Sequence, residues 1–394
     1  MGYKLKDIFD LQMGKTPSRN NSDYWNTEDY KWISIADLSK TGKYISDTKE
    51  YLSEVAVEES GIKVIPANTV IMSFKLSIGK TAITAEDMYS NEAIMAFHDK
   101  HVVDILPEYI FYMFKYRNWD EGSNKAVMGK TLNKVTLSEV EIEVCSIDEQ
   151  REIVRVLDKM MDILSGRENE LALLDDLIKA RFVELFGDPV HNPKDWTVKS
   201  LGELSIQINS GNTPKGGEQV YVEKGITFFR SQNVWKDRLE MDDIAYIDEE
   251  THASMSRSSL KHGDILMTKT GRINTENSSL GRAALYMGED DAANVNGHVY
   301  FIRLKPGVNN KFILRILVSD EYRDYIRSVC VGGIDKRQLN KNHIEDFPII
   351  CPPDDMVDEY ISLVEQVDKS KVAVQKALDE TQLLFDSLMQ KYFG

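Results

Sequence analysis

The stretch that decides the fold is IVRVLDKMMDILSGRENELALLDDLIKARFVELFG, residues 153–187, because its pattern returns later in the chain. The second copy is YISLVEQVDKSKVAVQKALDETQLLFDSLMQKYFG, residues 360–394, at a constant shift of 207 residues. A repeat of fixed spacing is considered first, since it determines the architecture. Two copies are too few for a solenoid. They indicate a pseudo-two-fold molecule with two heads and two long helices.

The repeat extends back into the segments that precede each helix. The shift grows from 197 through 202 and 205 to 207 residues, as insertions in surface loops between shared core elements would produce. The two heads are therefore expected to share a frame and to differ in their loops. The matched segments are Gly14–Pro17 with Gly211–Pro214, Ile78–Ala82 with Leu280–Ala284, Ser90–Ile94 with Val295–Val299, and Leu132–Lys134 with Leu339–Lys341.

Apolar residues in residues 153–187 follow alternating steps of three and four, the seam of a coiled coil, and only Arg167 and Arg181 interrupt it. We expect the two long helices to pair with each other in antiparallel fashion. The alternative is that each helix packs only on its own head. The seam residues are Ile153, Leu157, Met160, Leu164, Leu171, Leu174, Ile178 and Leu185.

Each head is predicted to be mixed α/β, so the fold class is α+β: two pseudo-repeated heads joined and spaced by two long helices. The predicted boundaries are 1–147 for the first head, 148–187 for the central helix, 188–350 for the second head and 351–394 for the C-terminal helix. Short strands are expected at Trp32–Ile35, Thr69–Ser73, Ile226–Phe229 and Asp264–Thr268, and helices at Pro107–Tyr116 and Asn310–Leu317.

Composition limits the protein class. The 394 residues include only three cysteines, at 145, 330 and 351, with no CxxC pair. This pattern favours a reducing compartment and argues against a disulfide framework or a structural zinc site. The N-terminus lacks an apolar signal region, and no stretch approaches 18 apolar residues. We expect a cytoplasmic protein without a membrane partner.

The net charge of −16 argues at first sight against nucleic acid. More than half of this excess lies in residues 148–187 and 352–394, which are the predicted long helices. Within the heads, basic residues gather in loops rich in Gly, Ser, Thr and Asn. Because a phosphate backbone meets the local potential, DNA remains a candidate partner.

No catalytic centre is predicted. Three Gly-Lys-Thr triplets, at 14–16, 79–81 and 129–131, resemble the end of a P-loop, but each lacks the glycine required five residues earlier. The Pro352-Pro353 pair lacks the flanking residues of an amino-methyltransferase loop and instead suits an extended lead into the last helix. We expect no cofactor and no metal in this chain.

The heads instead carry the side chains of nucleic-acid recognition. Arg and Lys bind guanine, Asn and Gln bind adenine, and short hydroxyl residues contact phosphates. An ordinary solvated loop remains the alternative for any single residue. The predicted DNA-binding residues of the first head are Lys15, Thr16, Ser18, Arg19, Lys75, Lys80, Asn91 and Lys130. Those of the second head are Lys215, Arg230, Ser231, Gln232, Asn233, Lys269, Arg272, Asn274, Arg282, Asn296, His298, Lys336 and Arg337.

These features together resemble the specificity subunit of a type I restriction–modification system, over essentially the whole chain. The resemblance is carried by Gly-x-Thr-Pro at 14–17 and 211–214, by 230–234 and 263–271, and by Ile147–Ile153 leading into Leu177–Phe182. The second helix departs from the family's Glu-Gln-x-x-Ile opening with Met356–Tyr360.

The resemblance implies a non-catalytic reader of double-stranded DNA. Each head would be a target-recognition domain for one half of a bipartite site, and the helices would set the spacing. The helices would also dock two modification subunits, which bind S-adenosylmethionine and methylate adenine. Motor–nuclease restriction subunits, which use ATP and Mg²⁺, would complete the complex. A protein-interaction scaffold is the alternative function, and a fused enzyme ranks third.

Overall fold

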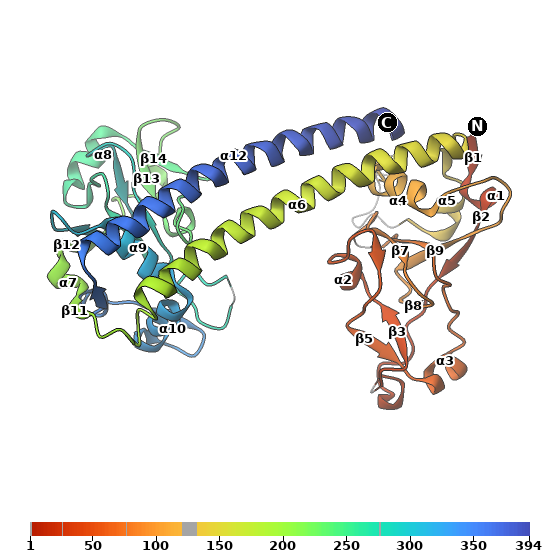
Figure 1. Ribbon diagram of the computed structural model, residues 1–394, viewed down its shortest axis with the longest axis horizontal. Helices are drawn as coiled ribbons and strands as arrows, with labels where there is room; N and C mark the ends of the chain where they lie inside the picture. The colour runs from red at the N-terminus through yellow and green to blue at the C-terminus, as the bar shows by residue number, and fades with distance from the viewer. Residues whose placement is uncertain (1, 26, 76, 120–131, 276) are drawn as a thin grey trace. The chain divides into compact units, whose positions relative to one another are not determined.

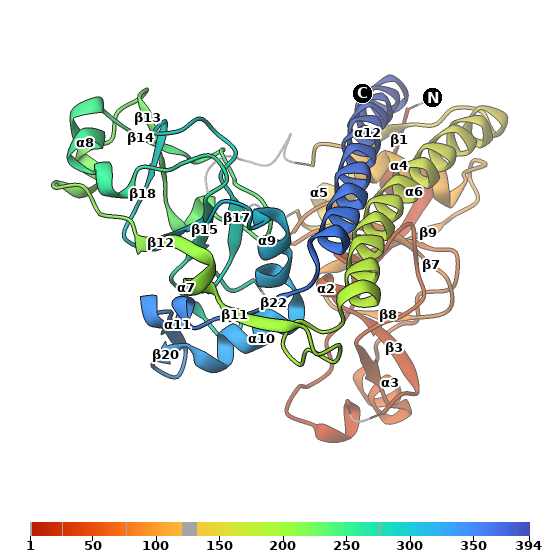
Figure 2. The same ribbon diagram turned by 60° about the vertical axis from the view of Figure 1, so that its left-hand side comes forward.

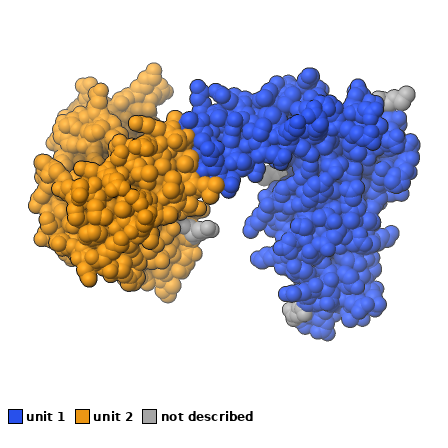
Figure 3. All heavy atoms as spheres, in the orientation of Figure 1, with its two compact units in different colours: residues 1–171, 373–394 blue, residues 172–372 orange. Residues whose placement is uncertain are grey.

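The computed structural model of the protein describes residues 2–25, 27–75, 77–119, 132–275 and 277–394. The chain forms two compact units, coloured separately in Figure 3. Unit 1 comprises residues 1–171 and 373–394, and unit 2 comprises residues 172–372. Each unit contains one head and a segment of both long helices, so each long helix is shared between the units (Figure 1).

The two long helices, α6 (Ile147–Phe186) and α12 (Asp354–Phe393), contain 40 residues each. Local signals set the limits of α6. Before its first turn, the Ser146 backbone N–H donates to the Glu149 carboxylate at 3.0 Å, and the Glu149 N–H donates to the Ser146 hydroxyl at 3.4 Å. This reciprocal pair is a capping box. At the other end Gly187 adopts a φ of +77°, the left-handed conformation that glycine tolerates best.

In unit 1, the first part of α6 packs against the last part of α12. Leu157 and Leu164 of α6 share one buried cluster with Phe385 and Met389 of α12. Arg167, which interrupts the apolar seam, donates hydrogen bonds to the Ala377 carbonyl and the Thr381 hydroxyl of α12. The polar interruption is therefore satisfied across the helix pair.

In unit 2, the last part of α6 packs against the first part of α12. Ile178 and Phe182 lie in one cluster with Tyr360 and Val364, and Arg181, the second interruption of the seam, forms a 2.7 Å ion pair with Glu359. Because the beginning of each helix meets the end of the other, the pairing is antiparallel. The predicted antiparallel pairing is confirmed.

The described residues of the unit 1 head form three sheets, with strand orders β2-β9-β6-β7-β4, β5-β3-β8 and β1-β10. Helix α4 packs on the largest sheet at β6 and β7. The elements before α6 are β1 (Gly2–Lys4), α1 (Leu5–Ile8), β2 (Phe9–Met13), η1 (Ser22–Tyr24), β3 (Tyr30–Ile33), α2 (Ile35–Leu38), β4 (Tyr44–Ile45), β5 (Glu50–Leu52), α3 (Glu54–Ser60), β6 (Val70–Ser73), β7 (Thr81–Thr84), β8 (Tyr89–Ser90), β9 (Ile94–Asp99), α4 (Pro107–Tyr116), α5 (Lys134–Ser138) and β10 (Glu141–Glu143).

The head of unit 2 repeats this topology, with orders β12-β19-β15-β17, β14-β13-β18 and β11-β22, and adds a three-stranded sheet β16-β21-β20. Its elements are β11 (Thr197–Ser200), α7 (Leu201–Leu204), β12 (Ser205–Ser210), η2 (Gly217–Val220), β13 (Ile226–Phe229), η3 (Ser231–Asn233), β14 (Ala245–Ile247), α8 (Glu249–Ser254), η4 (Ser256–Ser258), β15 (Ile265–Thr268), β16 (Thr270–Arg272), β17 (Ala283–Leu285), β18 (Ala293–Val295), β19 (Val299–Leu304), α9 (Asn310–Val318), α10 (Asp320–Val329), β20 (Val331–Gly332), β21 (Lys336–Gln338), α11 (Lys341–Glu345) and β22 (Pro348–Cys351).

The predicted strands and helices are confirmed, with boundaries that differ by one residue at β6, β15 and α9 and a larger shift at Trp32–Ile35. Strand β3 ends at Ile33 because Ser34 caps the short helix α2. The Ser34 hydroxyl accepts the Asp37 N–H, and the Asp37 carboxylate accepts the Ser34 N–H. A capping box thus terminates a β-rich run earlier than its composition predicts. No helix among the described residues is long and apolar enough to cross a membrane.

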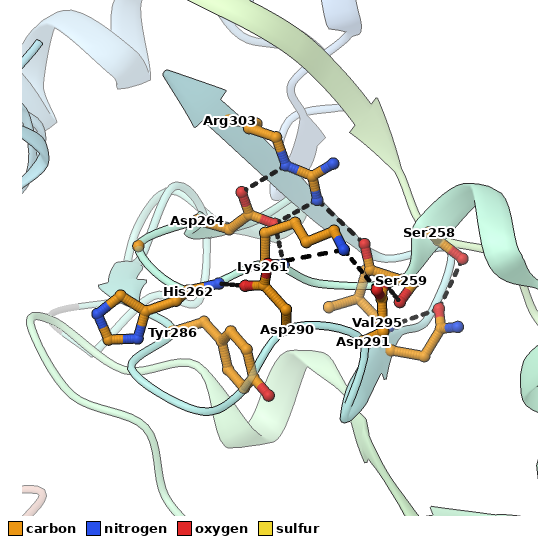
Figure 4. A network of polar contacts seen from close by, with 12 residues as sticks. Ser258, Ser259, Lys261, His262, Asp264, Tyr286, Asp290, Asp291, Val295 and Arg303 are labelled. Atoms are coloured by element: carbon orange, nitrogen blue, oxygen red, sulfur yellow. Dashed lines mark hydrogen bonds and ion pairs between the residues drawn. The ribbon is translucent and has the colours of Figure 1, made fainter. Parts of the chain in front are cut away.

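A buried polar network anchors the largest sheet of unit 2 (Figure 4). Asp264, only 1% exposed, lies just before β15, and Arg303 of β19 donates two hydrogen bonds to its carboxylate at 2.9 and 2.7 Å. The same guanidinium donates to the Ser259 carbonyl at 3.1 Å, and the Lys261 N–H donates to Asp264 at 2.8 Å. These bonds satisfy a buried charge pair that would otherwise be costly.

Candidate nucleic-acid interface

The Gly-x-Thr-Pro segments occupy equivalent places in the two heads. A Cβ on Gly14 would lie 2.2 Å from the Asn91 carbonyl oxygen, and a Cβ on Gly211 would lie 1.9 Å from the Val295 carbonyl oxygen. Only glycine permits this close approach. Each Gly-x-Thr-Pro loop is therefore fastened to the turn that carries Asn91 or Asn296.

Asn91 and Asn296 shape those turns with their own side chains. The Asn91 Oδ1 accepts the Ala93 N–H at 3.0 Å, and the Asn296 Oδ1 accepts the His298 N–H at 2.9 Å. Both are Asx turns, in which the amide oxygen is used within the fold. The amide nitrogens make no hydrogen bond to the residues that the structure describes, and His298 is exposed at the second turn.

The same turn has different electrostatics in the two heads. In unit 1, the Thr16 hydroxyl donates to the Glu92 carboxylate, and this hydrogen bond holds the pKa of Glu92 below its ordinary value. In unit 2, Gly297 stands at the equivalent position, beside Thr213. A phosphate near this turn would thus lie beside the negative charge of Glu92 in unit 1. In unit 2 the equivalent residue, Gly297, carries no charge.

Most of the predicted cations of unit 1 have internal partners. The Lys15 ammonium donates to the Ser60 carbonyl, Lys80 donates to the Ser39 hydroxyl, and Arg19 forms an ion pair with Glu50. The Arg19 guanidinium also lies 3.8 Å from the centre of the Trp25 ring, whose Nε1 donates to the Ser18 carbonyl. Lys75 lies over the Phe74 ring at 5.2 Å. Lys130 lies outside the described residues.

In unit 2, several predicted residues come together from three separate segments. Strands β16 and β21 pair so that Arg272 opposes Lys336 and Gly271 opposes Arg337. Lys269 joins them, because its N–H donates to the His298 carbonyl and its carbonyl accepts the Leu339 N–H, both at 2.9 Å. We refer to Lys269, Arg272, His298, Lys336 and Arg337 as the β16–β21 edge.

The β16–β21 edge is open to solvent at its charged ends. The Arg272 side chain is 68% exposed and forms a 3.3 Å ion pair with Asp335, itself exposed. Such a surface pair contributes little to stability and exchanges readily for another anion. The edge can therefore donate to base edges or to phosphates. Lys215 and Asn274 are also exposed, without being tied to this group by a hydrogen bond between described residues.

The predicted group at 230–233 has a mainly structural role. Asn233 is 1% exposed and donates to the carbonyls of Glu240 and Asp243, each at 3.1 Å. The Arg230 side chain pairs with Asp243 at 3.1 Å, and Gln232 also donates to that carboxylate. Ser231 begins the short η3 turn. These contacts hold the loop after β13 in shape, and only Gln232 among the four is exposed.

Arg282 is likewise placed inside the fold, with 9% exposure. Its guanidinium stacks 3.8 Å from the centre of the Trp235 ring. Trp235, Arg238 and Arg323, which the sequence analysis did not single out, surround it. The signal available in the sequence was the run of basic and acidic residues in α10 (Asp320–Val329), which includes Arg323 and Arg327. Among the described residues, no group of three or more His, Cys, Asp and Glu side chains could hold a metal ion.

Comparison with known proteins gives a consistent result. Residues 1–173 and 193–381 match the family described as "Type I restriction modification DNA specificity domain". The chain is 26% identical over 413 residues to the type I restriction enzyme MjaIX specificity subunit of Methanocaldococcus jannaschii, covering 98% of this chain and 91% of that protein. It is 28% identical over 194 residues to the EcoR124I/EcoR124II specificity subunit of Escherichia coli, covering 48% and 47% of the two chains.

Two solved structures have a similar fold. One is the type I restriction–modification S subunit from M. genitalium, with a TM-score of 0.55, 13% identity, and coverage of 100% of this chain and 96% of that one. The other comes from a study of complex assembly and conformational transition of the type I R-M system, with a TM-score of 0.61, 17% identity, and coverage of 100% and 97%. At these identities the likeness concerns the fold alone.

Proposed function

The chain belongs to the type I restriction–modification DNA specificity family, and on that premise we propose that it is the DNA-reading subunit of a type I restriction–modification complex. Each head would read one half of a bipartite site in double-stranded DNA. The observation that carries this proposal is the β16–β21 edge, where basic side chains converge on a small sheet that unit 2 adds to the frame repeated in the two heads. Two heads with one frame and different loops suit two different half-sites.

The β16–β21 edge offers donors of the right kind for base readout. A two-stranded ribbon fits the major groove, and a guanidinium can donate two hydrogen bonds to guanine O6 and N7. Arg272 is the best-placed reader because, among the described residues, its one ion-pair partner is the exposed Asp335. Lys269, Lys336 and His298 flank it and suit phosphates or base edges. In unit 1, the partly exposed Lys75 forms no ion pair with a described residue and is the corresponding candidate.

The catalytic steps would reside on partner subunits. We propose that modification subunits bind S-adenosylmethionine, methylate adenine and dock on the long helices, and that restriction subunits use ATP and Mg²⁺. Exposed apolar side chains support docking on the helices, because such residues mark interaction surfaces. Leu177 of α6 is 47% exposed and Leu384 of α12 is 52% exposed. These two positions are related by the 207-residue shift, which suits two copies of one partner.

The deciding experiment is methylome sequencing of cells that carry this protein with its cognate modification subunit. The expected result is methylated adenine in one bipartite, asymmetric motif, lost when this chain is deleted. A matched strain carrying the modification subunit alone is the control. Unchanged adenine methylation without this chain would contradict the proposal and would favour the protein-interaction scaffold.

A further inference from the structure

Two arginines of unit 2, Arg282 and Arg323, are held in the fold without a carboxylate partner. Arg282 is 9% exposed and Arg323 is half-buried. Neither takes part in an ion pair between residues that the structure describes, whereas their neighbours Lys236, Arg238 and Arg327 each pair with an acid. Removing a cation from water without a counter-charge is unfavourable. The arrangement therefore requires an explanation.

The Arg282 guanidinium is held in a fixed orientation, and one of its edges has no hydrogen-bond partner among the described residues. Trp235 covers its face at 3.8 Å. Its Nε donates to the Ser278 carbonyl at 3.0 Å, and its Nη2 donates to the Asn277 carbonyl. The Nη1 edge makes no hydrogen bond within the described part of the chain. A stacked and oriented guanidinium with a free edge is prepared for an anion.

Helix α10 brings Arg323 to the same place. The turn at Gly281 packs on this helix so closely that a Cβ there would lie 2.8 Å from Cγ2 of Ile326. Arg323 lies one turn before Ile326 on the same side of the helix. Burial lowers the pKa of Arg282, and the positive charges of Arg323 and Arg238 lower it further.

Burial lowers the pKa of Arg323 more than the acids of α10 raise it, and those acids form their ion pairs with other cations. Asp324 forms its ion pair with Arg327 at 2.8 Å. Asp320 pairs with Lys236 at 2.8 Å, and Asp320 and Glu321 line the cavity between α10 and the long helices of unit 2. The two arginines therefore remain without an ion-pair partner among the described residues, and an external anion could supply one.

We propose that Arg282 and Arg323 bind the phosphate backbone of DNA beside the half-site that the head of unit 2 reads. This proposal rests on the proposed function. Its location favours DNA over an acidic protein surface, because the backbone of Arg282 is hydrogen-bonded to the residue that precedes the β16–β21 edge. The Arg282 N–H donates to the Thr268 hydroxyl at 2.9 Å, and Thr268 immediately precedes Lys269. Planar guanidinium groups match phosphate oxygens bidentately.

The test uses the full chain in complex with its modification subunit, and DNA carrying the motif found by methylome sequencing. Binding is measured over a series of salt concentrations for Arg323→Ala and Arg323→Gln. We expect affinity about tenfold lower for both variants, since a hydrogen bond to a charged group is lost. The slope of log K against log salt should fall by about one unit, on specific and non-specific DNA alike. The methylated motif should be unchanged.

Two control variants define the result. Arg323→Lys retains the charge and should retain the salt slope. Arg257→Ala removes an exposed arginine of η4, which follows α8 at the opposite end of unit 2 from α10 (Figures 1 and 2), and should alter neither affinity nor slope. Thermal melting of each variant confirms that the fold is intact.

Each outcome has a distinct meaning. Wild-type affinity and slope in both folded Arg323 variants would overturn the phosphate site while leaving the DNA-reading function in place. The Arg323 variants could instead bind DNA normally in the absence of the modification subunit but fail to bind that subunit. This result would show that the arginines contact an acidic protein partner, and it would also overturn the phosphate site. If the wild-type complex has no sequence preference, both the proposed function and this inference are wrong.

Discussion

At the residue scale, arginines of similar sequence context have opposite roles in unit 2. Arg272 is exposed beside Lys336, whereas Arg303 is locked onto the buried Asp264 carboxylate and Arg282 is stacked on Trp235. An exposed guanidinium such as that of Arg272 can exchange its partner for a base, whereas Arg303, paired with a buried carboxylate, holds the fold. Two mutational predictions separate these roles.

Arg272→Ala should alter the reading of one half-site only. Losing a base contact would cost about 1–3 kcal/mol and relax specificity at a single position. Lys75→Ala, in the other head, should affect only the other half-site and serves as the matched control. The measurement is competitive binding with single-base variants of the motif. Unchanged binding in both variants would mean that the DNA-contacting surface lies elsewhere.

Arg303→Ala should destabilise the protein by about 3–5 kcal/mol, because it leaves the Asp264 carboxylate buried and unpaired. The double variant Asp264→Asn with Arg303→Met should lose less, since no unpaired charge remains. Urea unfolding of both variants measures the difference. A double variant less stable than Arg303→Ala would contradict this account of the network.

At the element scale, the antiparallel pairing of β2 with β9 places a histidine opposite a carboxylate in the largest sheet of unit 1. His98 of β9 opposes Asp10 of β2, and its Nε2 lies 3.2 Å from the Gln12 Oε1. Burial lowers the pKa of His98, against a smaller opposing effect of Asp10. The sheet therefore prefers the neutral imidazole.

This preference predicts a pH dependence with a definite sign. The pKa of His98 is lower in the folded protein than in the unfolded chain, where it is about 6.5. Its contribution to stability is therefore complete above that pH and declines as the pH falls through the folded-state pKa. His98→Gln should lose less stability than the wild type between pH 7.5 and pH 5, measured by urea unfolding. Equal losses would mean that His98 does not titrate as its burial implies.

At the scale of the whole molecule, the repeat implies that the paired helices set the distance between half-sites. Arg167 meets Ala377 and Thr381 within unit 1, and Asp175 meets Lys371 at 2.6 Å within unit 2. A matched insertion in both helices between these contacts would keep the apolar seam in register. The suitable points follow Glu170 in α6 and Gln375 in α12.

Inserting one heptad at each of these points should lengthen the spacer and leave the half-sites unchanged. Seven residues add about 10.5 Å at 1.5 Å per residue, or roughly three base pairs at 3.4 Å each. Methylome sequencing reads both the half-sites and their separation. A heptad in α6 alone is the control and should reduce activity by disrupting the pairing. Full activity with unchanged spacing in the double insertion would show that the helices are not the ruler.

The sequence by itself determined the repeat, the order of heads and helices, and the positions of the principal strands. These features are local or periodic. The seam from Ile153 to Leu185 is visible because the spacing of apolar residues along the sequence follows the period of a helix. The sequence also predicted that Gly14 and Gly211 lie in equivalent loops. Even the polar interruptions Arg167 and Arg181 were visible, although their partners on α12 were not.

Only the tertiary structure decided which loop residues face solvent. Asn233 and Arg282 have the side chains of DNA readers, yet carbonyls and an aromatic ring supplied by the folded loops bury them. Arg323 has no motif, and it becomes a candidate because α10 packs against the turn at Gly281. Exposure and charge compensation depend on contacts between residues tens of positions apart, and a one-dimensional pattern does not contain those distances.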